Sequence, residues 1–398
     1  MIVRLVAVVV VTSGCGAQRE FFTTCPSSTM ECAGPSWTDQ EAVLFLVGDA
    51  GYVEFGENPV LQHLERVVSA LDEAGVPVTV LYLGDNVYDA GVRTDHPEDY
   101  RLLDAQVRVV RGRSPTAKAF FLAGNHDRAN TSEPIGIQRL QNQDDALAGL
   151  RAAGDSVRLI PPAGCPGPEL IEIKNRGTVV ARVLALDSPW WLLDLDAGSI
   201  CGSLSKLDVL DRLESAMSAE PHVPVIVAAH HPLVTGGVHG GAGSALRRLA
   251  YNARLLGEDV NSGPYRDYIA RIEAVLGASN RSIIHVAGHE HSLQVNRRTD
   301  HAHSWYDLVS GSASKRTAVR RVREEGVETL FAASLPGYMR LDFRSVDGER
   351  EILLSVVAGC VADPALPARA GENDLHPIPF CRALSSDRLR TVFFKLIS

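Results

Sequence analysis

The chain lacks an excess of positive charge and lacks a hydrophobic run long enough to cross a membrane. Its 398 residues carry 39 Lys and Arg against 48 Asp and Glu, a formal net charge of −9. General nucleic-acid binding relies on basic side chains that neutralise phosphates, so this composition argues against it. A phosphate-bearing substrate is still allowed, because bound metal ions can supply local positive charge. The apolar run at residues 5–11 is far shorter than the roughly 20 residues of a spanning helix.

The first residues predict an export signal. Arg4 precedes the apolar run, and the small residues 12–14 precede Cys15. A positive residue, a short apolar stretch and small residues are typical of a secretory signal. The end of this segment resembles a bacterial lipobox, which implies cleavage before Cys15 and lipidation of its sulfur; a plain secretory signal is the alternative. We therefore expect an exported protein, periplasmic or on the cell surface, anchored to a bacterial membrane by lipid.

The remaining six cysteines lack the close Cys/His spacing of a zinc site. An even number of cysteines in an exported chain indicates disulfides, although the sequence alone does not choose the pairing. Our hypothesis joins each cysteine to its neighbour: Cys25–Cys32, Cys165–Cys201 and Cys360–Cys381.

Hydrophobic periodicity predicts an α/β domain. Continuous apolar runs at 42–47, 78–83 and 119–123 are typical of buried strands, and Asn58-Pro59 between the first two begins a helix. Further strands are expected at 169–174, 179–186, 223–229, 281–287, 338–343 and 351–357, and further helices at 203–217 and 264–277. No internal repeat is visible.

The domain prediction follows from these patterns. Residues 1–14 form a signal peptide and 15–40 a flexible tether rich in small and polar residues. The catalytic domain covers 41–360, with an insertion at about 298–336. Residues 361–398 form a C-terminal extension that we expect to be linked to the domain by a disulfide.

Five expected strands end in residues that bind metals. Gly or Ala at the strand end is followed by Asp49, by Asp85, by Asn125, by His230 and by the pair His289 and His291. In open α/β sheets, ligands bind at the carboxyl ends of strands. One such motif is weak evidence, whereas five in order predict a cluster of oxygen and imidazole ligands suited to iron, zinc or manganese.

These motifs resemble the calcineurin-like metallophosphoesterase superfamily over about residues 41–300. Tyr88, three residues after Asp85, further resembles the purple acid phosphatases of the tartrate-resistant type. The resemblance implies a four-layer αββα sandwich, two mixed β-sheets flanked by helices, with two metal ions at the strand ends. It assigns the first metal to Asp49, Asp85, Tyr88 and His291 and the second to Asp85, Asn125, His230 and His289. A phenolate ligand implies Fe(III) at the Tyr88 site, with Fe(II), Zn(II) or Mn(II) at the other.

The resemblance also suggests residues that contact substrate. His126 matches the family's catalytic histidine, and we expect Asp127 to orient its imidazole. His239 matches a histidine of mammalian-type members that would bind phosphate or donate a proton. Asn86 is expected to touch substrate or to form turn hydrogen bonds. His231 is expected to bind substrate or to pack beneath the ligands.

The leading function is hydrolysis of small phosphate monoesters by metal-bound hydroxide, in an acid phosphatase that is a monomer. A phosphodiesterase or nucleotidase with the same metals is the first alternative, and a non-catalytic surface lipoprotein that retains the fold is the second. The basic cluster at 315–323 is followed by Glu324 and Glu325. We expect it to be a solvated face of the insertion, with attraction of phosphate or anionic lipid as the alternative.

Overall fold

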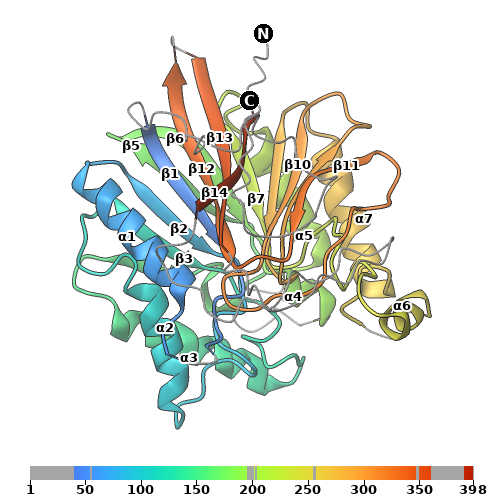
Figure 1. Ribbon diagram of the computed structural model, residues 1–398, viewed down its shortest axis with the longest axis horizontal. Coiled ribbons are helices and arrows are strands. Elements are labelled where there is room, and N and C mark those ends of the chain that lie inside the picture. Colours follow the sequence, from blue (N-terminus) through green and yellow to red (C-terminus); the bar gives the residue numbers. More distant parts are fainter. Residues whose placement is uncertain are drawn as a thin grey trace, which may run out of the picture.

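The protein is a four-layer αββα sandwich (Figure 1). The computed structural model describes residues 40–53, 56–194, 201, 204–253, 257–346, 349–359 and 390–397. Within these residues, two seven-stranded sheets pack face to face, and helices cover both outer sides. The predicted fold class is therefore confirmed.

The first sheet has a parallel half and an antiparallel half. β1 pairs in parallel with β2, whereas its other neighbour, β12, is antiparallel to it. The spatial order is β14 (Arg390–Ile397), β13 (Glu349–Ala358), β12 (Gly337–Val346), β1 (Gln40–Val47), β2 (Val78–Tyr82), β3 (Ala117–Phe121) and β4 (Ser156–Leu159).

The second sheet includes strands from the segment expected to be an insertion. Its order is β11 (Val327–Ala333), β9 (Leu293–Arg298), β10 (Trp305–Ser310), β8 (Ile283–Ala287), β7 (Val225–Ala228), β6 (Thr178–Ala185) and β5 (Glu169–Asn175). β10 lies between β8 and β9 and is wholly buried. The segment 298–336 thus contributes β10 and β11 to the sheet, and the predicted domain bounds stay a prediction.

Helices cover the outer face of each sheet. On the side of the first sheet lie α1 (Pro59–Glu73), α2 (Pro97–Val107) and α3 (Pro134–Leu150). The second sheet carries α4 (Ser188–Leu192), α5 (Lys206–Ser218), α6 (Ala245–Asn252) and α7 (Gly263–Gly277), and a 3-10 turn, Pro162–Gly164, precedes β5. The predicted start of α1 is confirmed, because the Asn58 side chain accepts hydrogen bonds from the amides of Val60 and Leu61.

Alternating side chains explain why the strand sequences are apolar throughout. In β1, Leu44 and Leu46 face the core between the sheets, whereas Val43 and Phe45 face the core beneath the helices. A strand covered on both faces carries apolar residues without a polar alternate. The apolar pattern of β1 therefore reflects its position between two cores, and Asp49, just beyond its end, lies where the layers meet.

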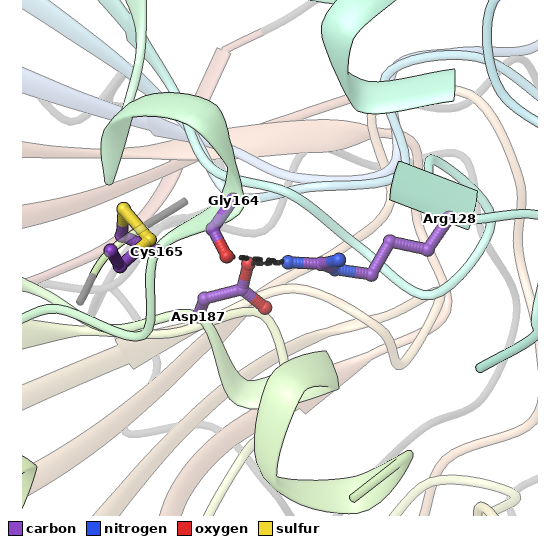
Figure 2. The surroundings of a disulfide bond; sticks show 5 residues. Arg128, Gly164, Cys165 and Asp187 are labelled. Atoms are coloured by element: carbon purple, nitrogen blue, oxygen red, sulfur yellow. Dashed lines mark hydrogen bonds and ion pairs between the residues drawn. A yellow bond between two sulfur atoms is a disulfide. The ribbon is translucent and has the colours of Figure 1, made fainter. Parts of the chain in front are cut away.

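A disulfide joins Cys165 to Cys201, which confirms that predicted pair (Figure 2). Next to it, the buried Arg128 guanidinium contacts the Asp187 carboxylate and donates to the Gly164 carbonyl at 3.0 Å. The other predicted pairs, and Cys15 with the signal and tether, lie outside the described residues. In the part of the chain that is described, no helix has the length and apolar character to cross a membrane.

Candidate metal centre

Strand ends from both sheets meet at one end of the sandwich. Asp49 follows β1, and its amide donates to the Gly84 carbonyl beyond β2 at 3.0 Å. Between the sheets, the His289 amide after β8 donates to the Asp49 carboxylate at 2.8 Å. The first bond joins neighbouring strand ends of one sheet and the second joins the two sheets, so the motifs that follow the strands surround a common centre.

Asp49, Tyr88 and His291 form a first group of candidate ligands. The Tyr88 hydroxyl lies 2.9 Å from Oδ1 of Asp49 and 3.0 Å from Nε2 of His291. Asp85 joins the group, because ligand atoms of Asp49, Asp85 and His291 lie within 4.8 Å of one another. The structure thus brings together the four residues that the resemblance assigns to the first metal.

Asn125, His230 and His289 form a second group, again beside Asp85. The Asn125 Oδ1 atom lies 2.9 Å from Nε2 of His230 and 3.2 Å from Nδ1 of His289. Nε2 of His230 is also 3.5 Å from Oδ1 of Asp85. Asp85 therefore lies between the two groups, where a carboxylate shared by two metals would stand.

The side-chain atoms of both groups are of the types that coordinate metal cations. His230 Nδ1 lies 2.7 Å from the Leu83 carbonyl, which can only accept, so Nδ1 holds a proton. Its Nε2 is then the atom free to bind a metal, and it lies near the Asn125 and Asp85 oxygen atoms, which bind cations as well. In the first group, burial raises the pKa of Tyr88, and the charges of Asp49 and Asp85 raise it further. A Tyr88 phenolate therefore requires a strong positive charge beside it.

The backbone is strained at three of these candidate ligands. Asp49, Asp85 and His289 have φ values of 58°, 54° and 67°, in the left-handed region that non-glycine residues rarely adopt. Such residues persist where the surrounding structure holds them, and they cluster at functional sites. Gly288 permits the close approach of the strand ends, because a Cβ there would lie 2.8 Å from Oδ2 of Asp49 and 2.9 Å from the Leu83 carbonyl.

Asp127 does not orient His126, so that prediction is wrong. The Asp127 carboxylate is buried and accepts hydrogen bonds from the backbone amides of Asn86, Val87 and Gly124 at 2.8–3.1 Å. These contacts tie the loop after β2 to the loop after β3. The carboxylate therefore fixes the backbone that follows Asp85, and no hydrogen bond joins it to an imidazole among the described residues.

The Asn86 side chain is held by residues at the end of β3 and in the loop that follows it. Its side chain is fully buried, and its Nδ2 donates to the Leu122 carbonyl at 2.7 Å and to Asp127 at 3.0 Å. These contacts give Asn86 a role in joining the two loops, and its contact with substrate stays a prediction.

His126 lies at the open side of the first group. Its ring centroid is 4.4 Å from that of Tyr88. Its Nδ1 lies 2.7 Å from the Asp89 carbonyl, which fixes the proton on Nδ1. Nε2 is thus left with a lone pair or a transferable proton. The group that orients His126 is a backbone carbonyl rather than the carboxylate expected from the sequence.

His239 lies at the second group. Its ring centroid is 4.3 Å from that of His289, and its Nδ1 lies 3.2 Å from Oδ1 of Asp259. Burial lowers the pKa of His239, but the hydrogen bond to Asp259 and the nearby acidic residues outweigh it, so the pKa is raised overall. Glu290, between the two histidine ligands, accepts from the His239 amide at 2.8 Å and holds the loop in place.

His231 lies beneath this group. Its Nδ1 is 2.9 Å from the Ser188 hydroxyl, and its ring packs edge-on against Tyr265. Burial and the neighbouring His230 and His239 lower its pKa. A neutral, buried imidazole agrees with packing, and substrate contact by His231 stays a prediction.

Glu258 is a site residue that the sequence did not reveal. Its carboxylate accepts from Asn125 Nδ2 at 3.0 Å, which turns the Asn125 Oδ1 toward His230 and His289. Together with His239 and His289 it also forms a cluster that could hold a metal ion. Glu258 follows no apolar strand, so no periodic signal marks it.

Comparison with known proteins places the fold. No curated protein is found to match the chain. Among solved structures, the chain is similar to one entitled "GAP50 the anchor in the inner membrane complex of Plasmodium", with a TM-score of 0.50 and 14% sequence identity over 80% of this chain and 84% of that one. An identity this low shows a shared fold alone. The model of the calcineurin-like phosphoesterase family matches residues 43–293, more than half of the chain and all of both ligand groups. The chain therefore belongs to the calcineurin-like phosphoesterase family.

Proposed function

We propose that the protein is a phosphate monoester hydrolase of the purple acid phosphatase type, with two metal ions. The observation that carries this proposal is the position of the Tyr88 hydroxyl, 2.9 Å from Asp49 and 3.0 Å from His291. An anionic phenolate favours a trivalent ion, so we assign Fe(III) to this group. The neutral Asn125 amide and the imidazoles suit Fe(II), Zn(II) or Mn(II).

The metals would supply Lewis acidity toward the phosphate oxygens and toward a water nucleophile. The protein's own residues hold the reacting groups around them. Asp85 keeps the two ligand groups adjacent, and Asp127 fixes the backbone of Asp85. His126 offers Nε2 to the oxygen that leaves phosphorus, because its Nδ1 is committed to the Asp89 carbonyl. His239, whose pKa the hydrogen bond to Asp259 raises against the effect of burial, is placed to bind a phosphate oxygen or to donate that proton.

Two alternative functions are considered for the same site. A phosphodiesterase or nucleotidase would use the same ligands, and the ratio of turnover on a monoester and a diester separates it from a monoesterase. A non-catalytic binding protein is the second alternative, and the anchor named in the GAP50 title shows that this fold alone does not decide between them. A full set of suitable ligand types in two close groups favours a catalytic protein.

The decisive test combines metal content, colour and turnover. Purified protein should contain two metals per chain, absorb visible light through Tyr88 and release phosphate from a monoester. Tyr88→Phe should remove the absorption band. Tyr338→Phe is the matched control, because the Tyr338 hydroxyl contacts His63 on α1 rather than the ligands. Colourless, metal-free protein that is inert toward monoesters contradicts the proposal, and a band that survives in Tyr88→Phe contradicts the role of Tyr88.

Export, lipid attachment at Cys15, a monomeric state and a small phosphate ester as substrate belong to the same proposal. The sequence of residues 4–15 supports export and lipid attachment. Mass spectrometry of protein from a bacterial membrane fraction should find a lipidated N-terminal Cys15. An unmodified, unprocessed N-terminus would contradict lipid anchoring.

A further inference from the structure

The segment 311–320, between β10 and β11, forms one wall of the candidate metal centre. The Ser314 hydroxyl donates to the Asp49 carbonyl, and the Thr317 amide donates to the His291 carbonyl at 2.8 Å. Farther along, the Arg320 amide donates to the Gly236 carbonyl at 2.9 Å, in the loop that leads to His239. The basic cluster therefore begins over the ligands, and the expectation that all of it is a solvated face is wrong for Lys315.

Lys315 lies against the aromatic ring of Tyr88. Its Nζ is 3.3 Å from the Tyr88 ring centroid and 5.0 Å from that of Tyr52. The ammonium thus lies on the face of one candidate ligand, and His126 packs against the same Tyr88 ring at 4.4 Å. Lys315 and His126 are consequently both neighbours of the first ligand group.

The charge of Lys315 is not neutralised by a buried acid. Within the described residues, its ion-pair partner is Asp89, at 3.6 Å, and that carboxylate is 84% exposed. An exposed ion pair at this distance contributes little energy, about 0–1 kcal/mol. Arg316, the next residue, is half-buried and forms no ion pair with another described residue, and burial lowers its pKa. Lys315 is therefore held beside the first ligand group with only an exposed acid as its ion-pair partner among the described residues, and a second cation follows it in the chain.

We infer that Lys315 binds the phosphate group of the substrate beside the first metal group. The inference rests on the proposed function. The Lys315 ammonium would leave the Tyr88 ring for a non-bridging oxygen of a dianionic phosphate, where a charge-assisted hydrogen bond replaces a cation–π contact. The remaining Arg316 charge raises the local attraction for anions. The sequence shows these two cations, but only the fold places Lys315 at the metal centre.

Calorimetric titration with inorganic phosphate tests the inference independently of turnover. Lys315→Gln in the metal-loaded protein should weaken phosphate binding by about 10–100-fold, as expected for loss of a charge-assisted hydrogen bond. Lys315→Arg should restore most of the affinity. Lys206→Gln is the matched control, because Lys206 also lies near an aromatic ring, Trp191, and pairs with an exposed acid, Asp194.

The rival explanation is that Lys315 merely packs on Tyr88 and supports metal binding. Lys315→Gln would then lower the metal content or shift the thermal midpoint, and phosphate affinity per bound metal would not change. Either that result or equal phosphate affinity in Lys315→Gln and wild type overturns the inference. If the wild type binds phosphate through Lys315 yet hydrolyses no ester, the proposed hydrolase function fails and the anion site stands.

Discussion

Replacing Arg128 alone should destabilise the fold more than replacing Arg128 and Asp187 together. The Arg128 side chain is 2% exposed and that of Asp187 is fully buried, and their charged groups are in contact (Figure 2). Asp187 also accepts from the Trp190 amide at 3.0 Å, which caps α4. In Arg128→Met, the carboxylate would stay buried with that amide as its remaining donor among the described residues.

The structure sets the size of the effect. Removing one partner of a buried ion pair costs about 3–5 kcal/mol, because an uncompensated charge is left in the interior. Total stabilities are about 5–15 kcal/mol, so this is a large fraction. Arg128→Met with Asp187→Asn removes both charges and retains an oxygen to cap α4. It should cost about 1–3 kcal/mol, the penalty for an unsatisfied Gly164 carbonyl.

The gap between single and double variants should depend on pH. Burial raises the pKa of Asp187, and Arg128 offsets part of that rise. A carboxyl whose folded pKa exceeds its unfolded value costs stability when ionised, and the cost disappears as pH falls through the folded pKa. Because Arg128→Met removes the offset, its penalty should be greatest at neutral pH and shrink on acidification.

Urea unfolding of the metal-free proteins, followed by tryptophan fluorescence, measures these differences without a contribution from metal binding. The reasoning is refuted if Arg128→Met lies within about 1 kcal/mol of wild type. It is equally refuted if the double variant is the less stable of the two at neutral pH.

Three further predictions concern the same end of the molecule. Replacing both Cys165 and Cys201 by Ser should lower the free energy of unfolding by about 4 kcal/mol, as expected for a loop of 36 residues, and urea unfolding measures the change. If reductant leaves the urea midpoint of the wild type unchanged, this prediction is contradicted. Asp127→Asn should weaken metal binding by about 10–100-fold without changing the pH profile of turnover, and loss of one limb of that profile would count against a backbone role. Glu258→Ala should weaken binding of the second metal by about tenfold. Glu258→Gln should bind it nearly as well as wild type, because the amide oxygen still accepts from Asn125. Equal losses in the two variants would exclude a role of Glu258 in orienting Asn125.

The sequence predicts the strand ends well because local and tertiary signals coincide there. Leu44 and Leu46 are apolar because they lie between the sheets, and Gly48 follows because the strand ends approach closely. Asp49 is then the first polar residue that emerges at the sheet edge. The same logic applies after β2, β3, β7 and β8, and it recovers both candidate ligand groups.

Other elements escape prediction because buried polar groups interrupt the apolar pattern. β10 contains Asp307, whose carboxylate pairs with Arg298 at 3.2 Å inside the protein. The sequence of this buried strand is therefore not a continuous apolar run. Side-chain partners that depend on tertiary contacts are equally hidden. Asp127 is adjacent to His126 in the chain yet turns toward the loop after β2, and Lys315 contacts Tyr88 at a sequence separation of 227 residues.

The hydrogen bond from the His289 amide to the Asp49 carboxylate has a consequence for the order of assembly. Asp49, Asp85 and Asn125 follow strands of the first sheet, and the histidine ligands follow strands of the second. β1 itself is flanked by β12, which the chain supplies only at Gly337–Val346. A partly folded chain with one finished sheet would hold half a coordination sphere and bind metal weakly. Tight metal binding can therefore begin only when most of the chain has folded, and the bound ions would then stabilise the contact between the two sheets.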